Sequence, residues 1–369
     1  MAKRRWLSPW KDSCEKPVLY HCISRVVDKR FAFDAEDKEK FRTFMRMYEN
    51  FSGCRVLSYC LMCNHIHLLL EVPPVPIGGI TDDELLQRLS AIYDEVVVAG
   101  FAQELKEARQ KLANNEVDEA YVEAIRARYT YRMHHLSEYM KSVMQRFTRW
   151  YNITHKRSGN LWEDAFKSVI VEDGEAARTM AAYIDLNPVR AGMVDDPAEY
   201  RWSSYGEAIG GGAKGNGKKA RAGLVRALTA HQGGEANADH WSGEVSKDYR
   251  MLLLETGVES TKEVVNAEGK WEVKTVRKGM KREVVEAELE QLSRSQDVAL
   301  GKMIRHRVRY FTDGAVIGSR VFVNDVFAAA RERFGPKRKD GARKMRGMGA
   351  ATGLLWSARD LRNLKKGMQ

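Results

Sequence analysis

The stretch CLMCNHIHLLLE, residues 60–71, places two histidines one residue apart inside a run of bulky aliphatic residues. Successive side chains of a β-strand point to opposite faces, so His65 and His67 share one face while Ile66 and Leu68 share the other. Two imidazoles on one face of a rigid strand lie close enough to bind one divalent ion together. The stretch therefore indicates a strand that carries either two core histidines or one wall of a metal site.

Two cysteines beside these histidines leave a second type of metal site open. Cys60, Cys63, His65 and His67 could form a closed zinc site with four ligands. The chain has five cysteines, a small and odd number that favours free thiols or metal ligands over disulfides. A closed zinc site needs a loop between its ligand pairs, whereas the two histidines belong to one strand face. The spacing therefore favours an open metal site over a zinc knuckle.

Hydrophobic periodicity predicts an α+β fold. One helix is expected to stop at Gly53, and Thr81 is a candidate N-cap for the helices that follow. Pro188 is expected to end a later helix, because the residue before a proline is disfavoured in helical geometry. The expected elements are a strand within residues 16–33, a helix over 35–53, one or two strands within 54–74, helices over 81–155, a strand over 166–172 and a helix over 174–187.

Composition divides the chain into three parts. An α+β domain is expected over residues 1–205. The stretch GGGAKGNGKKARAG, within residues 206–245, has a glycine content that is typical of a linker. Residues 246–369 are expected to form a basic, mostly helical C-terminal domain, in which one helix begins at Ser319 and ends before a Gly-Pro pair.

The positive charge of the chain is concentrated at one end. The net charge is +11, and residues 301–369 hold 17 Lys or Arg against 5 Asp or Glu. Such a segment favours nucleic acid as a partner, because neutralised phosphates release counterions, and a solvated basic tail is the alternative. No apolar run approaches the roughly 20 residues that cross a bilayer, and the N-terminus lacks the apolar core of a signal peptide. A cytoplasmic protein with no membrane partner is therefore expected.

The helix over residues 174–187 offers two further polar groups. Tyr183 and Asn187 are four residues apart, so they are expected to lie on one helix face. Asparagine offers a carbonyl oxygen to a hard cation, and a tyrosine phenol can attack phosphorus when a metal polarises the phosphate. The pattern alone does not distinguish Tyr183 from a packing tyrosine or from others such as Tyr205.

Five separated motifs occur in the first 205 residues: YHCISR, LSYCLMCNHIHLLLE, RWYNITHKRSGNLWEDAFKSVIVED, YIDLNPVRAGMV and YRWSSY. Their order and spacing resemble those of the REP-associated tyrosine transposases, the single-tyrosine HUH enzymes that bacteria carry beside repetitive extragenic palindromes. The resemblance implies a small antiparallel sheet flanked by helices. It also implies that the His-hydrophobic-His motif lies on a central strand and the nucleophilic tyrosine on a nearby helix.

Within this resemblance, His65 and His67 match the HUH pair of metal ligands. Tyr183 matches the family's nucleophile, and Asn187 matches its polar metal ligand. Such enzymes cut single-stranded DNA beside a hairpin, form a 5′-phosphotyrosine, release a 3′-hydroxyl and can rejoin the ends. Because oxygen ligands and the substrate phosphate would share the coordination sphere with imidazole, Mg²⁺ or Mn²⁺ is expected as the cofactor. The resemblance implies hairpin DNA of REP palindromes as the partner. It further implies a nucleoid-associated protein, either a monomer or a homodimer.

Two features depart from the family pattern. Residues 76–135 look like a helical insertion where many relatives have a short connection. This insertion could cover the site, form a dimer contact or be a surface elaboration. Cys63 stands where relatives usually have proline, and this difference is what keeps the zinc knuckle open as an alternative.

The motif HKRSGNLW and its surroundings supply candidate DNA contacts. Lys156 and Arg157 suit phosphates, and Trp162 could either stack on an unpaired base or pack in the core. Arg190 follows the tyrosine helix closely enough in sequence to reach a phosphate at the site.

The stretch RYFTDGAVIGSRVFVNDVFAAARERFG in the C-terminal region could form a helix, a glycine turn and a second helix. It resembles, more weakly, an extension of one branch of these transposases. Arg331 and Arg333 would then lie near the end of the second helix and suit groove binding. A two-helix packing unit would give the same pattern.

Two other functions remain compatible with the motifs. A non-catalytic regulator that binds palindromes would form no covalent adduct with DNA. An HUH replication initiator or conjugative relaxase would be supported by a fused helicase, but the chain has no GxxxxGK[ST] phosphate loop.

Overall fold

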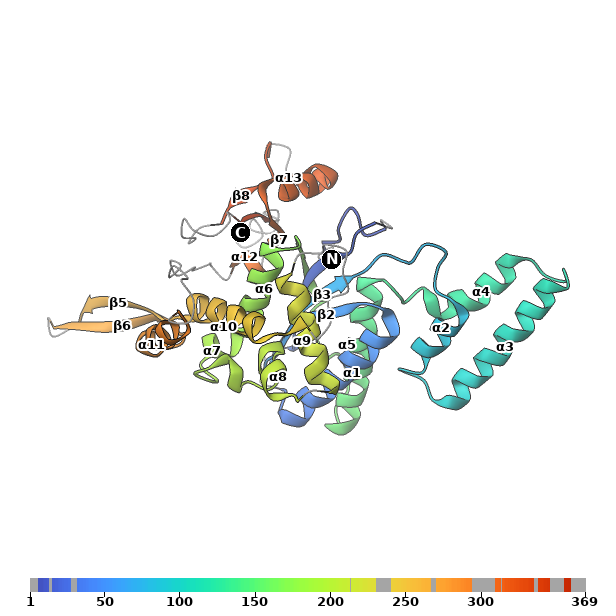
Figure 1. Cartoon of the computed structure of the whole chain (residues 1–369), viewed down its shortest axis with the longest axis horizontal. Helices are drawn as coiled ribbons and strands as arrows, with labels where there is room; N and C mark the ends of the chain where they lie inside the picture. The colour runs from blue at the N-terminus through green and yellow to red at the C-terminus, as the bar shows by residue number, and fades with distance from the viewer. Residues whose placement is uncertain are drawn as a thin grey trace.

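The computed structural model describes residues 6–12, 15–27, 32–212, 214–229, 240–266, 270–293, 309–312, 314–334, 338–345 and 355–359. The fold is a mixed α and β structure built around one seven-stranded sheet (Figure 1). In spatial order its strands are β2 (Arg55–Leu61), β3 (His65–Val72), β1 (Val18–Arg25), β4 (Lys167–Val171), β7 (Gly314–Gly318), β9 (Trp356–Arg359) and β8 (Arg343–Lys344). Neighbours pair antiparallel except for β4 and β7, which are parallel. The predicted α+β class with a largely antiparallel sheet is confirmed.

Helices cover both faces of this sheet. They are, on one face, α1 (Ala35–Ser52) and α5 (Leu136–Thr154) and, on the other, α6 (Glu175–Asp185) and α9 (Gly215–Leu228). Strand alternation divides the buried residues between the two faces. Tyr20 and Cys22 of β1 pack with α1 and α5, whereas Leu19 packs with α6 and α9. His65 and His67 lie four and two residues before Leu69 in β3, so all three side chains share one face of the strand. Because Leu69 packs with α6, the histidine pair points to the α6 face.

The first elements follow local sequence signals. The Asp34 side chain caps α1 by accepting a hydrogen bond from the Asp37 backbone N–H, and the Asp37 side chain accepts one from the Asp34 backbone N–H. The helix ends at Gly53, whose φ of 74° lies in the left-handed region that glycine adopts readily. The predicted end of this helix is therefore confirmed. Of the two possibilities left open for residues 54–74, the structure has two strands, joined by a turn at residues 62–64.

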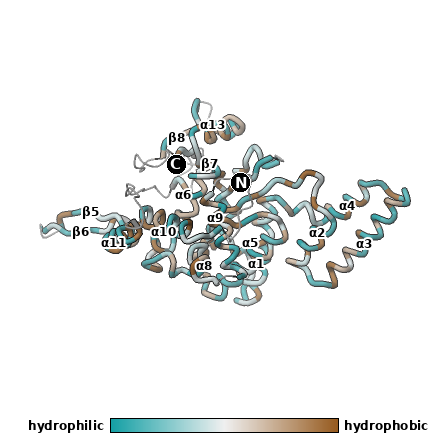
Figure 2. Tube along the Cα trace, viewed as in Figure 1, coloured by the Kyte–Doolittle hydropathy of each residue, from teal (hydrophilic) through white to brown (hydrophobic). Residues whose placement is uncertain are grey.

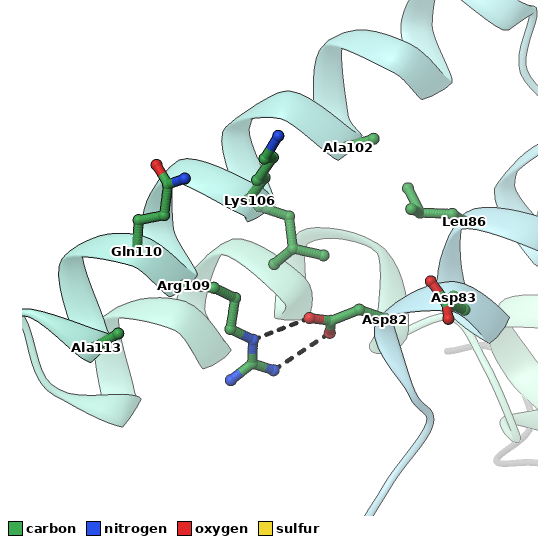
Figure 3. A pocket seen from close by; sticks show the side chains of 9 residues that line it. Asp82, Asp83, Leu86, Ala102, Lys106, Arg109, Gln110 and Ala113 are labelled. Carbon is green, nitrogen blue, oxygen red and sulfur yellow. Dashed lines mark hydrogen bonds and ion pairs between the residues drawn. The ribbon is translucent and has the colours of Figure 1, made fainter.

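The predicted helical insertion projects from the body of the molecule (Figure 1). It consists of α2 (Asp82–Leu89), α3 (Glu95–Ala113) and α4 (Glu119–Thr130). Thr81 caps α2 as predicted, since its side chain accepts from the Glu84 backbone. Figure 2 shows hydrophilic and hydrophobic residues alternating along α3 and α4, a pattern typical of surface helices. In the hollow between α2 and α3 (Figure 3), Arg109 Nε lies 2.9 Å from Asp82 Oδ2.

The predicted glycine-rich linker is wrong for most of its described residues. Residues 215–228 form α9, which packs against β2. At Gly223 a Cβ atom would lie 2.4 Å from the Val56 carbonyl oxygen and 2.8 Å from that of Leu57. Glycine here permits close approach of a helix to a strand, instead of flexibility. Residues 213 and 230–239 of the predicted linker lie outside the described residues.

In the described residues of the C-terminal region, strands accompany the helices, whereas a mostly helical domain was predicted. Its elements are α10 (Gly243–Gly257), a separate ribbon of β5 (Ser260–Val265) and β6 (Trp271–Arg277), α11 (Arg282–Ser293), α12 (Arg309–Thr312), β7, α13 (Arg320–Ala329), β8 and β9. Three of these strands extend the main sheet, so the region does not form a separate core. None of the helices in the described part of the chain combines the length and apolar character that a bilayer-spanning segment requires.

The predicted pair of helices around a glycine turn is also wrong. Residues Gly314–Gly318 form β7, and its apolar residues are buried beside β4. A short, continuous apolar run suits a strand that is covered on both faces. The second predicted helix is confirmed as α13, since Ser319 caps it by accepting from the Phe322 backbone. The Gly-Pro pair that was expected to end it lies outside the described residues.

Candidate active site

The histidine pair lies on the strand between β1 and β2. His67 is opposite Ile23 of β1 and Cys60 of β2, while His65 is opposite Arg25 at the end of β1. The centroids of the two imidazole rings are 4.9 Å apart, and the side chain of His67 is buried. The structure thus places both histidines on one face, as the alternation predicted.

A third histidine, His21, joins them from β1. Its Nε2 lies 2.9 Å from His67 Nδ1, and the two rings stack with centroids 5.1 Å apart. His21 is fully buried. Sequence reasoning missed this residue although YHCISR was one of the five motifs. The missing information was the register, since only the pairing of Ile23 with His67 shows that His21 faces the histidine pair.

Tyr183 approaches the histidines from α6. Its ring centroid is 5.9 Å from that of His67 and 6.0 Å from that of His21, with edge-on geometry in both cases. The face of α6 against the sheet is rich in small residues, which let the helix come close; they are Ala176, Ala177, Ala181 and Ala182. The structure therefore brings together a tyrosine and histidines from elements that are far apart in sequence.

Phe311 of α12 covers Tyr183. The two rings are stacked, with centroids 4.3 Å apart and planes 14° apart. Only 4% of Tyr183 and 2% of Phe311 are exposed. The Phe311 carbonyl oxygen also lies 2.9 Å from His21 Nδ1, so this short helix contacts both the tyrosine and a histidine. Sequence reasoning missed Phe311, because nothing local indicates that α12 returns to the sheet.

Asn187 does not extend the tyrosine helix as predicted. Helix α6 ends at Asp185, and a second short helix, α7 (Asn187–Ala191), follows with Pro188 in its first turn. A proline is tolerated there because the first helical N–H groups have no intrahelical partner. Asn187 Nδ2 donates to the carbonyl oxygens of Tyr183 and Ile184, both at 3.1 Å. Asn187 thus lies at the end of the Tyr183 helix and satisfies its last carbonyls.

Arg190 of α7 contacts Tyr183 in two ways. Its Nη1 donates to the Tyr183 carbonyl oxygen at 2.9 Å, and its guanidinium lies 4.9 Å from the centre of the Tyr183 ring. A cation over the ring face is attracted by its quadrupole. The structure therefore places positive charge beside the phenol, where the sequence predicted a residue able to reach phosphate.

Burial keeps the three histidines uncharged. It lowers the pKa of His21 from 6.5 to about 4. Burial, with a contribution from the Arg25 charge, also lowers the pKa of His65 to about 4. The pKa of His67 is lowered further by burial and by the neighbouring His65. At neutral pH all three are therefore neutral imidazoles, the form in which histidine binds metals.

The ring nitrogens of His65 and His67 are of a type that binds divalent metal ions. His65 Nδ1 lies 2.6 Å from Asn64 Oδ1 and His67 Nδ1 lies 2.9 Å from His21, which leaves Nε2 of each ring as the remaining donor atom. A second partner at Nδ1 is the usual arrangement of metal-binding histidines. The amide oxygen of Asn187, the third predicted ligand, is of a type that suits Mg²⁺ or Mn²⁺.

The zinc knuckle is not formed. Within the described residues, no three or more His, Cys, Asp or Glu side chains converge as a metal site would require. Cys60 Sγ lies 3.5 Å from Met62 Sδ, and Cys63 Sγ accepts a hydrogen bond from Lys38 at 3.5 Å. The two cysteines thus have separate partners.

The predicted DNA-contact loop is split between surface and core. Lys156 is exposed and Arg157 is partly exposed. Trp162 is only 4% exposed, and its Nε1 donates to Thr148 Oγ1 at 2.9 Å. Base stacking by Trp162 is therefore wrong, and the core-packing alternative holds. The loop adjoins the end of β1, where the Glu163 backbone donates to the Arg25 carbonyl at 2.9 Å.

The two predicted C-terminal DNA contacts lie elsewhere. Arg331 and Arg333 form a short 3-10 helix after α13. The Arg333 guanidinium is 3.7 Å from the centre of the Trp6 ring, and that of Arg331 is 5.3 Å from the Phe327 ring. The structure thus packs both against aromatic side chains and does not bring them to the histidine and tyrosine cluster.

Similarity to a known protein family is found in the segment that holds the first three strands. The family described as "Transposase IS200 like" matches residues 14–76, which hold His21, His65 and His67 but not Tyr183. A solved structure titled "Structure of the REP associates tyrosine transposase bound to a REP hairpin" is 11% identical, with a TM-score of 0.34 over 58% of this chain and 88% of that chain. No curated protein matches the sequence. The family model therefore confirms a resemblance to IS200-like transposases for residues 14–76.

Proposed function

We propose that the chain is a single-tyrosine transposase that cuts and rejoins single-stranded DNA beside a palindromic hairpin. The observation that carries this proposal is the distance of 5.9 Å between the rings of His67 and Tyr183. The first residue lies in the segment matched by the transposase family and the second lies far outside it. A tyrosine beside a histidine pair supplies a nucleophile and two candidate metal ligands for strand cleavage.

The reaction exchanges one phosphodiester for another. Tyr183 Oη attacks the scissile phosphorus, the P–O3′ bond breaks and a 5′-phosphotyrosine forms. The phenol proton is lost, and the departing 3′ oxygen takes up a proton to become a hydroxyl. Attack of a 3′-hydroxyl on the phosphotyrosine reverses the steps and rejoins a strand. Neither water nor a nucleotide is consumed, because the bond energy is retained in the phosphotyrosine.

His65 and His67, with the amide oxygen of Asn187, would hold one Mg²⁺ or Mn²⁺. This ion would supply Lewis-acid polarisation of the scissile phosphate. The chain's own residues provide the remaining functions. Arg190 holds positive charge against the Tyr183 ring, and this charge suits the approach of a phosphate. Arg25, exposed beside His65, suits a neighbouring phosphate of the same strand.

DNA reaches Tyr183 only after α12 moves. With 4% of Tyr183 exposed and Phe311 stacked on its ring, the arrangement is closed to a phosphodiester. We infer that substrate engagement displaces Phe311. Helix α12 comprises only the four residues Arg309–Thr312, so its displacement costs less than that of a long packed helix.

The proposal is tested with end-labelled hairpin DNA, Mn²⁺ or EDTA, and a denaturing gel. A metal-dependent protein–DNA adduct is expected with the wild type but not with Tyr183→Phe. Tyr205→Phe is the matched control, because it also removes one hydroxyl from a buried tyrosine but lies on α8 (Ser204–Gly210). Hairpin binding without an adduct in the wild type would favour a non-catalytic palindrome-binding regulator instead.

A further inference from the structure

A chain of hydrogen bonds runs from the C-terminal region into the histidine pair. His21 Nδ1 lies 2.9 Å from the Phe311 carbonyl oxygen, and His21 Nε2 lies 2.9 Å from His67 Nδ1. All three residues are at most 3% exposed. Water therefore does not compete for these contacts. Both nitrogens of His21 and the Nδ1 atom of His67 each have one partner.

The chemistry of these partners determines where the protons lie. A carbonyl oxygen only accepts, so His21 Nδ1 carries a hydrogen and donates it to Phe311. A neutral imidazole has a single N–H, and His21 Nε2 is therefore an acceptor. The contact at 2.9 Å then requires that His67 Nδ1 carries the hydrogen. The Nε2 atom of His67 is left with a lone pair.

An alternative with a charged His21 is unfavourable. Imidazolium would donate from both nitrogens and would reverse the hydrogen bond to His67. A buried cation is costly without a carboxylate partner. Within the described part of the chain, no ion pair joins His21 or His67 to an acidic residue.

We propose that His21 is a positioning residue that holds His67 in its Nδ1–H tautomer and so presents the Nε2 lone pair for metal binding. This inference rests on the proposed function, because it concerns the metal site of the transposase. His21 is not itself a ligand in this arrangement, since both of its nitrogens are engaged. The fixed tautomer corresponds to the role that partners of metal-binding histidines commonly have.

The partner of His65 differs in a way that matches its position. His65 lies at the start of β3 and is partly exposed, and its Nδ1 is 2.6 Å from the side-chain oxygen of Asn64. A neighbour in sequence can serve a residue at a strand end. His67 is buried inside the strand, so its partner must come from the adjacent strand. Both arrangements leave Nε2 as the free donor atom of the pair.

Two substitutions separate positioning from packing. His21→Gln keeps an acceptor, because the glutamine amide extends about as far as the imidazole Nε2. His21→Phe keeps a planar ring and removes the acceptor. Ile23→Val is the control, since Ile23 lies in β1 like His21, is opposite His67 of β3 and has a side chain that forms no hydrogen bond.

The first readout is the tautomer of His67 in the metal-free, full-length protein. Long-range ¹H–¹⁵N spectra distinguish the two ring nitrogens, and His67→Asn assigns the signals. We expect the Nδ1–H tautomer in the wild type, in Ile23→Val and in His21→Gln, and loss of this preference in His21→Phe. An Nε2–H tautomer in the wild type would overturn the proposal, whether or not any variant folds.

The second readout is Mn²⁺ affinity, measured by electron paramagnetic resonance without DNA. His21→Phe is expected to weaken binding about 10- to 100-fold, the usual effect of removing a partner of a metal-binding histidine. His21→Gln should recover most of the loss. Unchanged affinity in a folded His21→Phe protein would contradict the proposal. Neither readout depends on DNA cleavage, so failure of the proposed function would appear separately, as a wild type that binds Mn²⁺ but forms no DNA adduct.

Discussion

The ring of Phe311 stacks on the ring of Tyr183 with centroids 4.3 Å apart, and the Phe311 carbonyl oxygen accepts a hydrogen bond from His21. One residue of the C-terminal region thus contacts both the candidate nucleophile and the histidine that orients His67. In the proposed function, removal of Phe311 from this position exposes Tyr183. The C-terminal region is therefore expected to control access to the site.

Phe311→Ala should expose the Tyr183 phenol. Its rate of nitration by tetranitromethane, measured by peptide mass spectrometry, is expected to rise several-fold. Loss of the buried ring should also lower the free energy of unfolding by about 3–5 kcal/mol. Phe327→Ala is the control, because it removes a similarly buried ring that packs against Phe334 instead. Equal nitration of Tyr183 in both variants would mean that Phe311 does not cover the phenol.

The depressed histidine pKa values make stability depend on pH in a defined window. The unfolded chain protonates these histidines below about pH 6.5, while the folded chain keeps His21 neutral to about pH 4. The contribution of these neutral histidines to the free energy of unfolding is therefore fully present above about pH 6.5. It decreases as the pH falls from about 6.5 towards 4. His21→Gln should make that fall shallower by up to about 1.4 kcal/mol per pH unit.

Urea denaturation from pH 7.5 to pH 4.5 measures this difference. Ile23→Val, which changes no titrating group, is expected to retain the wild-type slope. A His21→Gln slope equal to that of the wild type would show that His21 titrates alike in the folded and unfolded states.

Gly223→Ala should disrupt the contact between α9 and β2. The added Cβ would lie 2.4 Å from the Val56 carbonyl oxygen, so the helix must shift, at a cost of about 1–3 kcal/mol. Gly100→Ala in α3 is the control, because a Cβ there meets nothing within 4 Å and should stabilise the helix by about 0.5–1 kcal/mol. Thermal unfolding compares the two, and a neutral Gly223→Ala would contradict the close packing.

Substitutions in the loop after α5 are expected to change either DNA affinity or stability, depending on whether the residue is on the surface or in the core. Lys156→Gln and Arg157→Gln should each weaken hairpin binding and reduce the salt dependence of binding by about one ion, with stability unchanged. Trp162→Phe should instead lower stability, because its indole N–H loses the bond to Thr148. Fluorescence anisotropy at several salt concentrations measures the first effect. A Trp162→Phe protein of normal stability and weakened binding would restore the base-stacking interpretation.

The sequence predicted those elements whose boundaries are set by residues only a few positions away. The cap at Asp34, the stop at Gly53 and the shared face of His65 and His67 all follow from backbone geometry over a few positions. The rest depends on distant contacts. The glycines of α9 indicated a linker because composition does not reveal that Gly223 meets a strand.

The same limit applies to the site. His21 could be placed beside His67 only once the register of β1 and β3 was known, and Phe311 only once α12 was seen to return to the sheet. Tyr183 was identified by its resemblance to a family motif, and helical spacing alone would have left Tyr205 equally eligible. Tyr183 and Asn187 were predicted to lie on one helix because they are four residues apart. In the structure, α6 ends at Asp185 and Asn187 begins α7.

Identification of the amino acid that becomes attached to DNA tests the proposed nucleophile most directly. The wild-type protein is incubated with a hairpin substrate and Mn²⁺, digested with nuclease and protease, and analysed by peptide mass spectrometry. A 5′-phosphodeoxynucleotide is expected on Tyr183, and it should be absent when EDTA replaces Mn²⁺. A modification on another tyrosine, or hairpin binding with no modified peptide, would contradict this expectation.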